Sequence, residues 1–117
     1  MKILAIQNRM GIGDMIIYLP FIEAISKKFN TKVDILVKDS SKASEILKEN
    51  KFINEIINLD RNNSNRKGVH DGILGSFSLA SQLKTYKFQK VFIFNSSLRY
   101  KLICNLASIK EIYQYPL

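Results

Sequence analysis

Two polar segments of the sequence contain residue types that could bind or react with a ligand. The first is Gly11-Ile12-Gly13-Asp14, where Gly11 and Gly13 let the backbone turn tightly and approach a ligand, and a carboxylate follows at the head of a predicted helix. A dinucleotide-binding fingerprint would need a further glycine at Ile16, and the Gly-Lys-Ser/Thr of a phosphate-binding P-loop is absent. Asp14 is therefore either an N-cap for free helix amides or a catalytic or substrate-binding carboxylate.

The second segment consists of Asn95, Ser96, Ser97 and Arg99, which follow an apolar run and precede a predicted helix. In a structural interpretation, one serine caps the helix and Arg99 is a solvated side chain. In a functional interpretation, small polar groups and a guanidinium at the end of a strand bind a sugar hydroxyl, a carboxylate or a phosphate. Both interpretations stay open at this stage.

The remaining polar residues give weaker signals. His70 is followed by Asp71, but no second His, Cys or carboxylate stands at ligand spacing, so no metal site is predicted. Arg61, Arg66 and Lys67 belong to a loop without apolar residues, for which a solvated loop is the main interpretation and contact with an anionic acceptor the alternative. Cys104 stands alone in an apolar stretch and is predicted to be a small buried residue.

Strands and helices alternate along the chain around these segments. Strands are predicted at 2–7, 32–37, 56–59, 91–94 and 112–115, and helices at 14–29, around 43–47 with a cap at 38–41, at 73–83 and at 98–108. This alternation predicts an α/β fold, a Rossmann-like parallel sheet with helices on both faces. Ligands bind such sheets where the strand order reverses, here beyond the first and fourth strands, which brings segments 7–14 and 95–99 together.

The helical periodicity also predicts which residues face the sheet. The predicted buried positions are Met15, Tyr18, Leu19, Ile22, Ile25 and Phe29 in the first helix, Ile73, Phe77, Ala80 and Leu83 in the third, and Leu98, Leu102 and Leu106 in the last. Pro20 either occupies the first turn of the first helix or lies inside a longer helix that starts near Asp14. Gly72 and Gly75 weaken the start of the third helix.

Composition limits the class of protein. The 117 residues correspond to one domain, with 46% hydrophobic and 24% charged residues, as in globular proteins. The net charge of +8 rests mainly on lysine, which AT-rich codon usage favours together with isoleucine and asparagine, so it indicates tolerance of anionic partners without naming one. The first apolar run is too short for a signal peptide and no run could span a membrane, so a cytoplasmic protein is expected.

The opening of the chain resembles glycosyltransferase family 9, the ADP-heptose:lipopolysaccharide heptosyltransferases. In that family the first strand leads into a Leu-Gly-Asp loop and a helix with a proline six residues after the aspartate, a spacing that Gly13, Asp14 and Pro20 keep. Segments 32–37, 54–61 and 86–99 are similar to the family's next strands. The chain departs from the family at Asn8, often arginine, and at Tyr18, often a small polar residue.

The resemblance implies the N-terminal half of a GT-B fold, in which residues 1–117 form one Rossmann-like acceptor-binding domain and a second domain holds the nucleotide sugar. Asp14 would be the base of an inverting transfer, and Gly11, Gly13, Asn95, Ser96, Ser97 and Arg99 would bind substrate. The implied donor is ADP-heptose, without a separate cofactor or metal. The implied acceptor is a lipopolysaccharide core or another anionic glycan, reached in the cytoplasm or at the cytoplasmic face of the inner membrane. This chain alone is expected to be inactive.

Two other classes of function are weighed against this one. A nucleotide-binding Rossmann fragment of a different enzyme would explain the alternation and Asp39 near the end of the second strand, but it lacks the glycine fingerprint. A basic nucleic-acid-associated module would explain the charge of +8, yet no recognised aromatic and basic motif is present. No nucleic-acid partner is therefore expected.

Overall fold

A computed structural model describes residues 1–7, 12–38, 50–59, 72–94 and 98–115. Their elements in chain order are β1 (Ile3–Gln7), α1 (Ile12–Phe29), β2 (Val33–Lys38), β3 (Ile53–Leu59), α3 (Gly72–Tyr86), β4 (Lys90–Ile93), α4 (Leu98–Leu106) and β5 (Glu111–Gln114). The predicted short helix around 43–47, the loop 61–68 and His70 lie outside the described residues.

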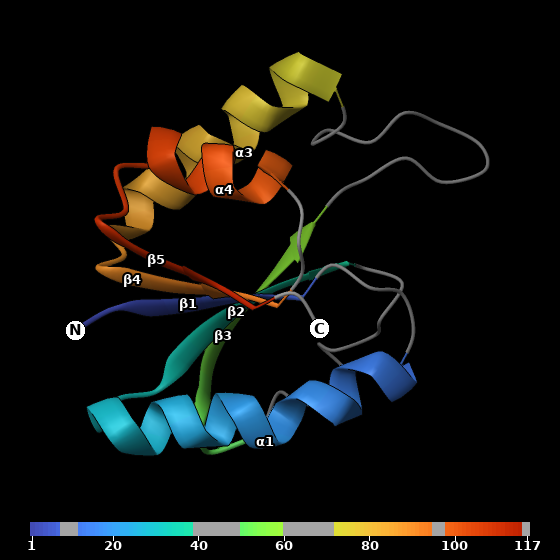
Figure 1. Cartoon of the computed structure of the whole chain (residues 1–117), viewed down its shortest axis with the longest axis vertical. Coiled ribbons are helices and arrows are strands. Elements are labelled where there is room, and N and C mark those ends of the chain that lie inside the picture. The colour runs from blue at the N-terminus through green and yellow to red at the C-terminus, as the bar shows by residue number, and fades with distance from the viewer. Residues whose placement is uncertain (8–11, 39–49, 60–71, 95–97, 116–117) are drawn as a thin grey trace.

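The strands form one sheet in the order β3-β2-β1-β4-β5, and each neighbouring pair is parallel. Helix α1 covers one face, and α3 and α4 lie together over the other (Figure 1). The predicted Rossmann-like α/β fold with helices on both faces is therefore confirmed. The run around Val91 forms β4, which lies between two strands as its continuous apolar sequence predicts.

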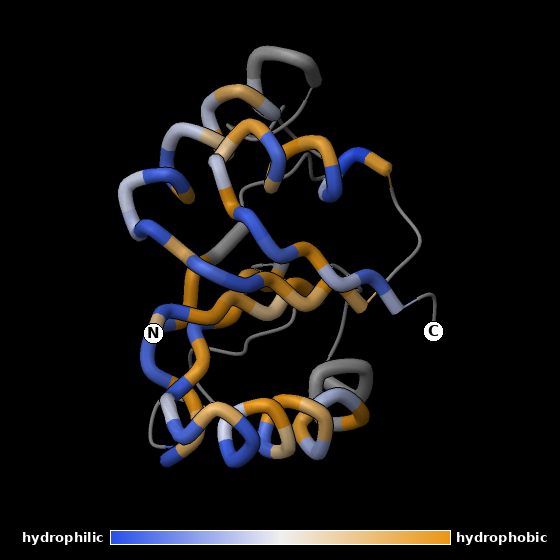
Figure 2. The backbone as a smooth tube through the Cα atoms, turned by 60° about the vertical axis from the view of Figure 1, so that its left-hand side comes forward, coloured by the Kyte–Doolittle hydropathy of each residue, from blue (hydrophilic) through white to orange (hydrophobic). Residues whose placement is uncertain are grey.

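Two apolar cores lie on the two faces of the sheet. In β1, which is buried along its whole length, Leu4 and Ile6 face α3 and α4, whereas Ile3 and Ala5 face α1. Successive strand residues point to opposite faces, so a central strand must be apolar at every position. The helices need only one apolar side, and the lower helix in Figure 2 alternates accordingly between hydrophobic and hydrophilic stretches.

Helix α1 runs from Ile12 to Phe29 with Pro20 inside it, so the longer of the two predicted helices is the right one. Pro20 is exposed, and its ring nitrogen cannot donate a hydrogen bond to the preceding turn. Tyr18 and Ile22 are buried as predicted, and Leu19, Ile25 and Phe29 pack partly buried against the same core.

The third and last helices bury partly different residues from those predicted. In α3, Leu79, Ala80 and Leu83 are buried, but Phe77 is 54% exposed. In α4 the predicted stripe faces solvent: Leu98, Leu102 and Leu106 are 70%, 61% and 50% exposed. The buried residues of α4 are Tyr100, Ile103 and Cys104. They also recur at helical spacing.

Strand β3 starts at Ile53, three residues before the predicted strand, because of a bulge opposite Asp34. In the register, Val33 pairs with Ile53 and Ile35 with Ile56, so Asn54 and Glu55 both stand opposite Asp34. The buried Asp34 carboxylate uses Oδ1 to accept hydrogen bonds from Asn54 Nδ2 at 2.9 Å and from the Glu55 backbone N–H at 3.1 Å. The Asp34 side chain thus accepts a backbone hydrogen bond that regular strand pairing would otherwise satisfy at the bulge.

Candidate functional site

The strand order reverses between β1 and β4, as the alternation predicts. From β1 the sheet continues to β2 and β3 on one side and to β4 and β5 on the other. The two strands end side by side, because the Phe94 backbone N–H donates to the Ile6 carbonyl oxygen at 3.0 Å. The chain therefore enters segments 8–11 and 95–97 from neighbouring points, the place where ligands bind to open α/β sheets. Gly11, Asn95, Ser96 and Ser97 themselves lie outside the described residues.

Two helices begin at this edge of the sheet. Helix α1 starts at Ile12, directly after the segment that follows β1, and α4 starts at Leu98, directly after the segment that follows β4. The N-terminus of a helix presents free backbone N–H groups and the positive end of the helix dipole. The edge where β1 and β4 end is thus suited to binding a carboxylate, a phosphate or a developing negative charge.

Gly13 and Asp14 are the second and third residues of α1. An N-cap residue precedes the first helical residue, so Asp14 lies one turn further on than a cap and belongs to the helix itself. The interpretation of Asp14 as the N-cap is wrong for this helix. A carboxylate in the first turn of a helix is still favoured by the helix dipole.

Arg99 is the second residue of α4 and is half-buried. A cation in the first turn of a helix is disfavoured by the dipole, so the stability of α4 does not account for this residue type. The interpretation of Arg99 as a fully solvated side chain is also wrong, because part of its surface is covered. A half-buried guanidinium at this edge can make directed contacts to an anionic or hydroxyl-rich ligand.

A group of aromatic rings holds α1 against the ends of β4 and β5. Tyr18 stacks on Phe94 with centroids 5.3 Å apart, and Phe21 lies 6.0 Å from Phe94. Tyr115 also stacks with Phe94, at 6.2 Å between centroids. Tyr18 is 3% exposed, so it is a core residue. The tyrosine at this position therefore packs within the fold. The three-residue spacing of Tyr18 and Phe21 on one helix could have indicated from the sequence that these two rings are neighbours. Nothing in the sequence indicates that Phe94 and Tyr115 belong to the same group.

Other reactive groups do not converge on this edge. Cys104 is fully buried among the residues of the α3 and α4 core, and burial raises the pKa of its thiol from 9.0 to about 12. A thiol with that pKa is not a nucleophile at neutral pH. In the described parts of the chain, no three His, Cys, Asp or Glu side chains form a group that could hold a metal ion, and no helix there could span a membrane.

Two solved glycosyltransferase structures resemble the chain over most of its length. ADP-heptose lipopolysaccharide heptosyltransferase II of E. coli matches 97% of this chain with a TM-score of 0.75 and 17% identity, over 30% of its own length. A glycosyl transferase of family 9 from Veillonella parvula matches 97% with a TM-score of 0.76 and 20% identity, over 32% of its length.

A third structure shares the fold with a different role. The C-terminal domain of a hydrogenase from Pyrococcus furiosus matches 97% of this chain and 90% of its own, with a TM-score of 0.63 and 16% identity. The sequence itself matches no family model and no curated protein. The chain spans about a third of the length of the two glycosyltransferases, and the likeness is one of fold: a Rossmann-like domain built as in family 9 glycosyltransferases.

Proposed function

We propose that this chain is the acceptor-binding domain of an inverting glycosyltransferase that transfers a heptose-type sugar from ADP-heptose to a lipopolysaccharide core or a similar anionic glycan. The observation that carries the proposal is the junction of β1 and β4, after which α1, with Asp14 in its first turn, and α4 begin. The spacing of Gly13, Asp14 and Pro20 and the fold likeness to two glycosyltransferases support it.

Asp14 would act as the general base of the transfer. A sugar hydroxyl is too weak an acid to attack an anomeric carbon efficiently while it keeps its proton. The carboxylate accepts that proton as the hydroxyl oxygen bonds to the anomeric carbon, and the bond from this carbon to the ADP oxygen breaks on the opposite side. The configuration inverts, ADP leaves with the electron pair, and a positioned base of this kind accelerates transfer by about 10²–10⁴.

The other residues of the junction would bind the acceptor. Gly11 and Gly13 allow the backbone to approach a sugar, and the side chains of 95–97 offer hydroxyl and amide groups for its hydroxyls. Arg99 and the two helix N-termini would hold the acidic groups of the acceptor. The ADP would be held by a second domain, which fits a chain of about a third of the length of the similar glycosyltransferases. The reaction would take place in the cytoplasm, at or near the cytoplasmic face of the inner membrane.

The proposal is tested by separating binding from transfer. The purified chain, incubated with ADP-heptose and a lipopolysaccharide core acceptor, should bind the acceptor in NMR titrations but transfer no sugar, because in this proposal a second domain supplies the contacts to the leaving group. Fusion to, or mixing with, a donor-binding domain should restore transfer. Turnover by the chain alone at the level of a full-length heptosyltransferase would contradict the assignment of a single acceptor domain.

A second candidate is a nucleotide-binding Rossmann module outside the glycosyltransferases. It is compatible with the fold, since the chain also matches a hydrogenase domain over 90% of that domain's length and one fold serves several functions. It is disfavoured by Ile16, which stands where the dinucleotide fingerprint needs its third glycine. Saturable binding of NAD to the chain, without binding of a core glycan, would replace the first candidate by this one.

A further inference from the structure

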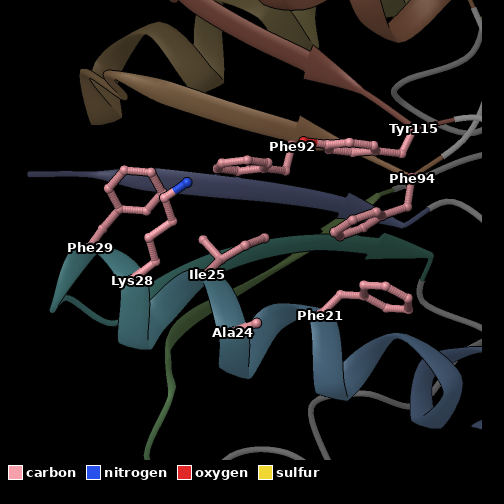
Figure 3. A pocket seen from close by; sticks show the side chains of 8 residues that line it. All are labelled: Phe21, Ala24, Ile25, Lys28, Phe29, Phe92, Phe94 and Tyr115. Carbon is pink, nitrogen blue, oxygen red and sulfur yellow. The ribbon is translucent and has the colours of Figure 1, made fainter.

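An apolar groove lies between α1 and the last two strands, on the sheet face that α1 covers. It encloses about 280 Å³ and is lined by Phe21, Ala24, Ile25, Lys28, Phe29, Phe92, Phe94 and Tyr115. Figure 3 shows α1 along one side, with the rings of Phe92, Phe94 and Tyr115 along the sheet side. None of these residues belongs to the proposed transfer site.

The sheet side of the groove is a rigid aromatic surface. Phe92 and Phe94 are 7% and 2% exposed. The Tyr115 ring is stacked with both, at 6.4 Å from Phe92 and 6.2 Å from Phe94. On the open side, Phe21 and Tyr115 are 46% and 45% exposed, so apolar rings face solvent at the mouth of the groove. A preformed apolar pocket with exposed rings at its mouth is typical of a ligand site.

The dimensions fit a single hydrocarbon chain. Along α1 the groove extends from Phe21 to Phe29, eight residues, which is about 12 Å at about 1.5 Å per residue. An acyl segment of eight to ten carbons has about this size, whereas a sugar or nucleotide would leave its polar groups without partners here.

One cation stands at the Phe29 end of the groove. Lys28 Nζ lies 5.6 Å from the centre of the Phe29 ring, and among the described residues it has no carboxylate partner. The adjacent Lys27 differs, because its Nζ forms an ion pair with Glu23 at 2.9 Å. Lys90 also approaches Phe29, at 5.2 Å, but it is paired with Glu111. An apolar groove with an ammonium at one end that no carboxylate of the described residues pairs is complementary to an amphiphile with an anionic head.

We propose that this groove binds the acyl chain of a single-chain anionic lipid, with the carboxylate or phosphate head at Lys28 and the chain running along α1 toward Phe21. The inference goes beyond the proposed sugar transfer and does not require it, since the groove shares no residue with the transfer site. Its binding can be measured on the chain as it is.

The test titrates the purified chain with decanoate below its micelle concentration and follows tyrosine fluorescence, which no tryptophan obscures. Ala24→Phe fills the groove from the exposed side of α1 and should abolish saturable binding. Lys28→Ala should weaken decanoate binding about tenfold, because a charged hydrogen bond is lost, and leave binding of neutral decanol unchanged. Lys27→Ala is the matched control and should bind both as the unaltered chain does.

Three results would overturn the proposal: no saturable binding of decanoate, equal binding by the unaltered chain and Ala24→Phe, or equal losses for Lys27→Ala and Lys28→Ala. Light scattering distinguishes a protein occupant, since a dimer that Ala24→Phe dissociates would assign the groove to a second copy of the chain. Circular dichroism and thermal unfolding verify that each variant folds. If Ala24→Phe does not fold, Tyr115→Ala, which removes an exposed ring at the mouth, should weaken decanoate binding, and unchanged binding would contradict the proposal.

Discussion

The two ends of the sheet use charged and polar residues for different purposes. Where the strands begin, a lysine stands within two residues of each strand start in the described sheet: Lys2, Lys32, Lys51, Lys90 and Lys110. Lysines also occupy the last turns of α1 and α3, where they complement the helix dipoles. Where β1 and β4 end, the helices begin instead, and Arg99 stands against the dipole of α4.

Several charged groups at the strand starts serve the fold, whereas Lys28 in the last turn of α1 is the proposed contact of a lipid head. At the strand starts, Asp34 accepts two hydrogen bonds and lies 3.4 Å from Lys2 Nζ, and Lys90 is bound to Glu111. These groups have partners within the fold. Of the lysines at the strand starts, Lys2 and Lys90 are thus paired within the fold. At the strand ends, the dipole of α4 disfavours a cation in its first turn, so helix stability does not explain why residue 99 is an arginine.

The largest expected effect concerns Cys104, in α4 near the end of the sheet where the strands begin. Its thiol pKa is raised from 9.0 to about 12 by burial, so at pH 8 the folded chain should hold about a thousandfold less thiolate than the unfolded chain. Alkylation by iodoacetamide should be slowed accordingly, with the chain in urea as reference. The neutral thiol stabilises the fold below about pH 9, and this contribution is lost as the pH rises toward 12. If iodoacetamide alkylated the folded chain within tenfold of the rate for the unfolded chain, Cys104 would be a reactive thiol, and this end of the sheet would hold a reactive group.

The next effect concerns Asp14 at the opposite end. In a polypeptide that joins this chain to a donor-binding domain, Asp14→Asn should lower kcat by at least about a hundredfold with little change in acceptor KM, because the base is lost and the shape is kept. The melting temperature should hardly change. A variant that kept its turnover and melted at a lower temperature would make Asp14 a structural residue, and the two ends would no longer differ.

Asp34→Ala tests directly the end where the strands begin. It leaves the Glu55 N–H and the Asn54 amide at the bulge without their acceptor, so the free energy of unfolding should fall by about 2 kcal/mol in a urea titration. Asp34→Asn keeps one acceptor oxygen and should cost less. Lys2→Ala removes a half-exposed partner and should cost under about 1 kcal/mol. Acceptor binding should be unchanged in all three folded variants, and a loss there would contradict the separation of the two ends.

The strands and their ends could be predicted because burial on both faces demands continuous apolar runs. The runs at 2–7 and 91–94 therefore identified central strands, and the alternation with helices placed the junction of β1 and β4. The start of β3 could not be predicted, because Asn54 and Glu55 are polar residues whose place in the strand depends on a carboxylate twenty residues earlier in the chain. A side chain that accepts hydrogen bonds at a bulge does not change the hydrophobic periodicity of the sequence, so the pattern cannot indicate it.

The orientation of α4 could not be predicted either. Its sequence has two apolar stripes at helical spacing, one through Leu98, Leu102 and Leu106 and one through Tyr100, Ile103 and Cys104. Hydrophobicity favours the leucines, but only packing against the sheet and α3 decides which side is buried. For the candidate site, the sequence identified Asp14 and Arg99 as candidate residues. It missed the neighbouring ring stack of Tyr18, Phe94 and Tyr115, because these rings come from three segments that are distant in the sequence.

The smallest expected effect is the salt response of acceptor binding, which distinguishes Arg99 from ordinary surface charge. Neutralising Arg61, Arg66 and Lys67, which lie outside the described residues, should weaken binding of an anionic acceptor a few-fold at low ionic strength only. Exposed charges are screened over about 8 Å at physiological salt, so their long-range attraction disappears as salt is added.

Arg99→Ala should instead weaken binding at both low and high salt, because a directed contact from a half-buried guanidinium is screened less. Lys101→Ala, two residues further along α4 and exposed, is the matched control and should behave like the loop variants. Acceptor affinity measured by calorimetry at two salt concentrations gives the comparison. If Arg99→Ala and Lys101→Ala lose affinity equally and only at low salt, Arg99 is one more solvated charge. The end of the sheet where β1 and β4 finish would then bind its ligand through the helix N-termini and Asp14 without a guanidinium.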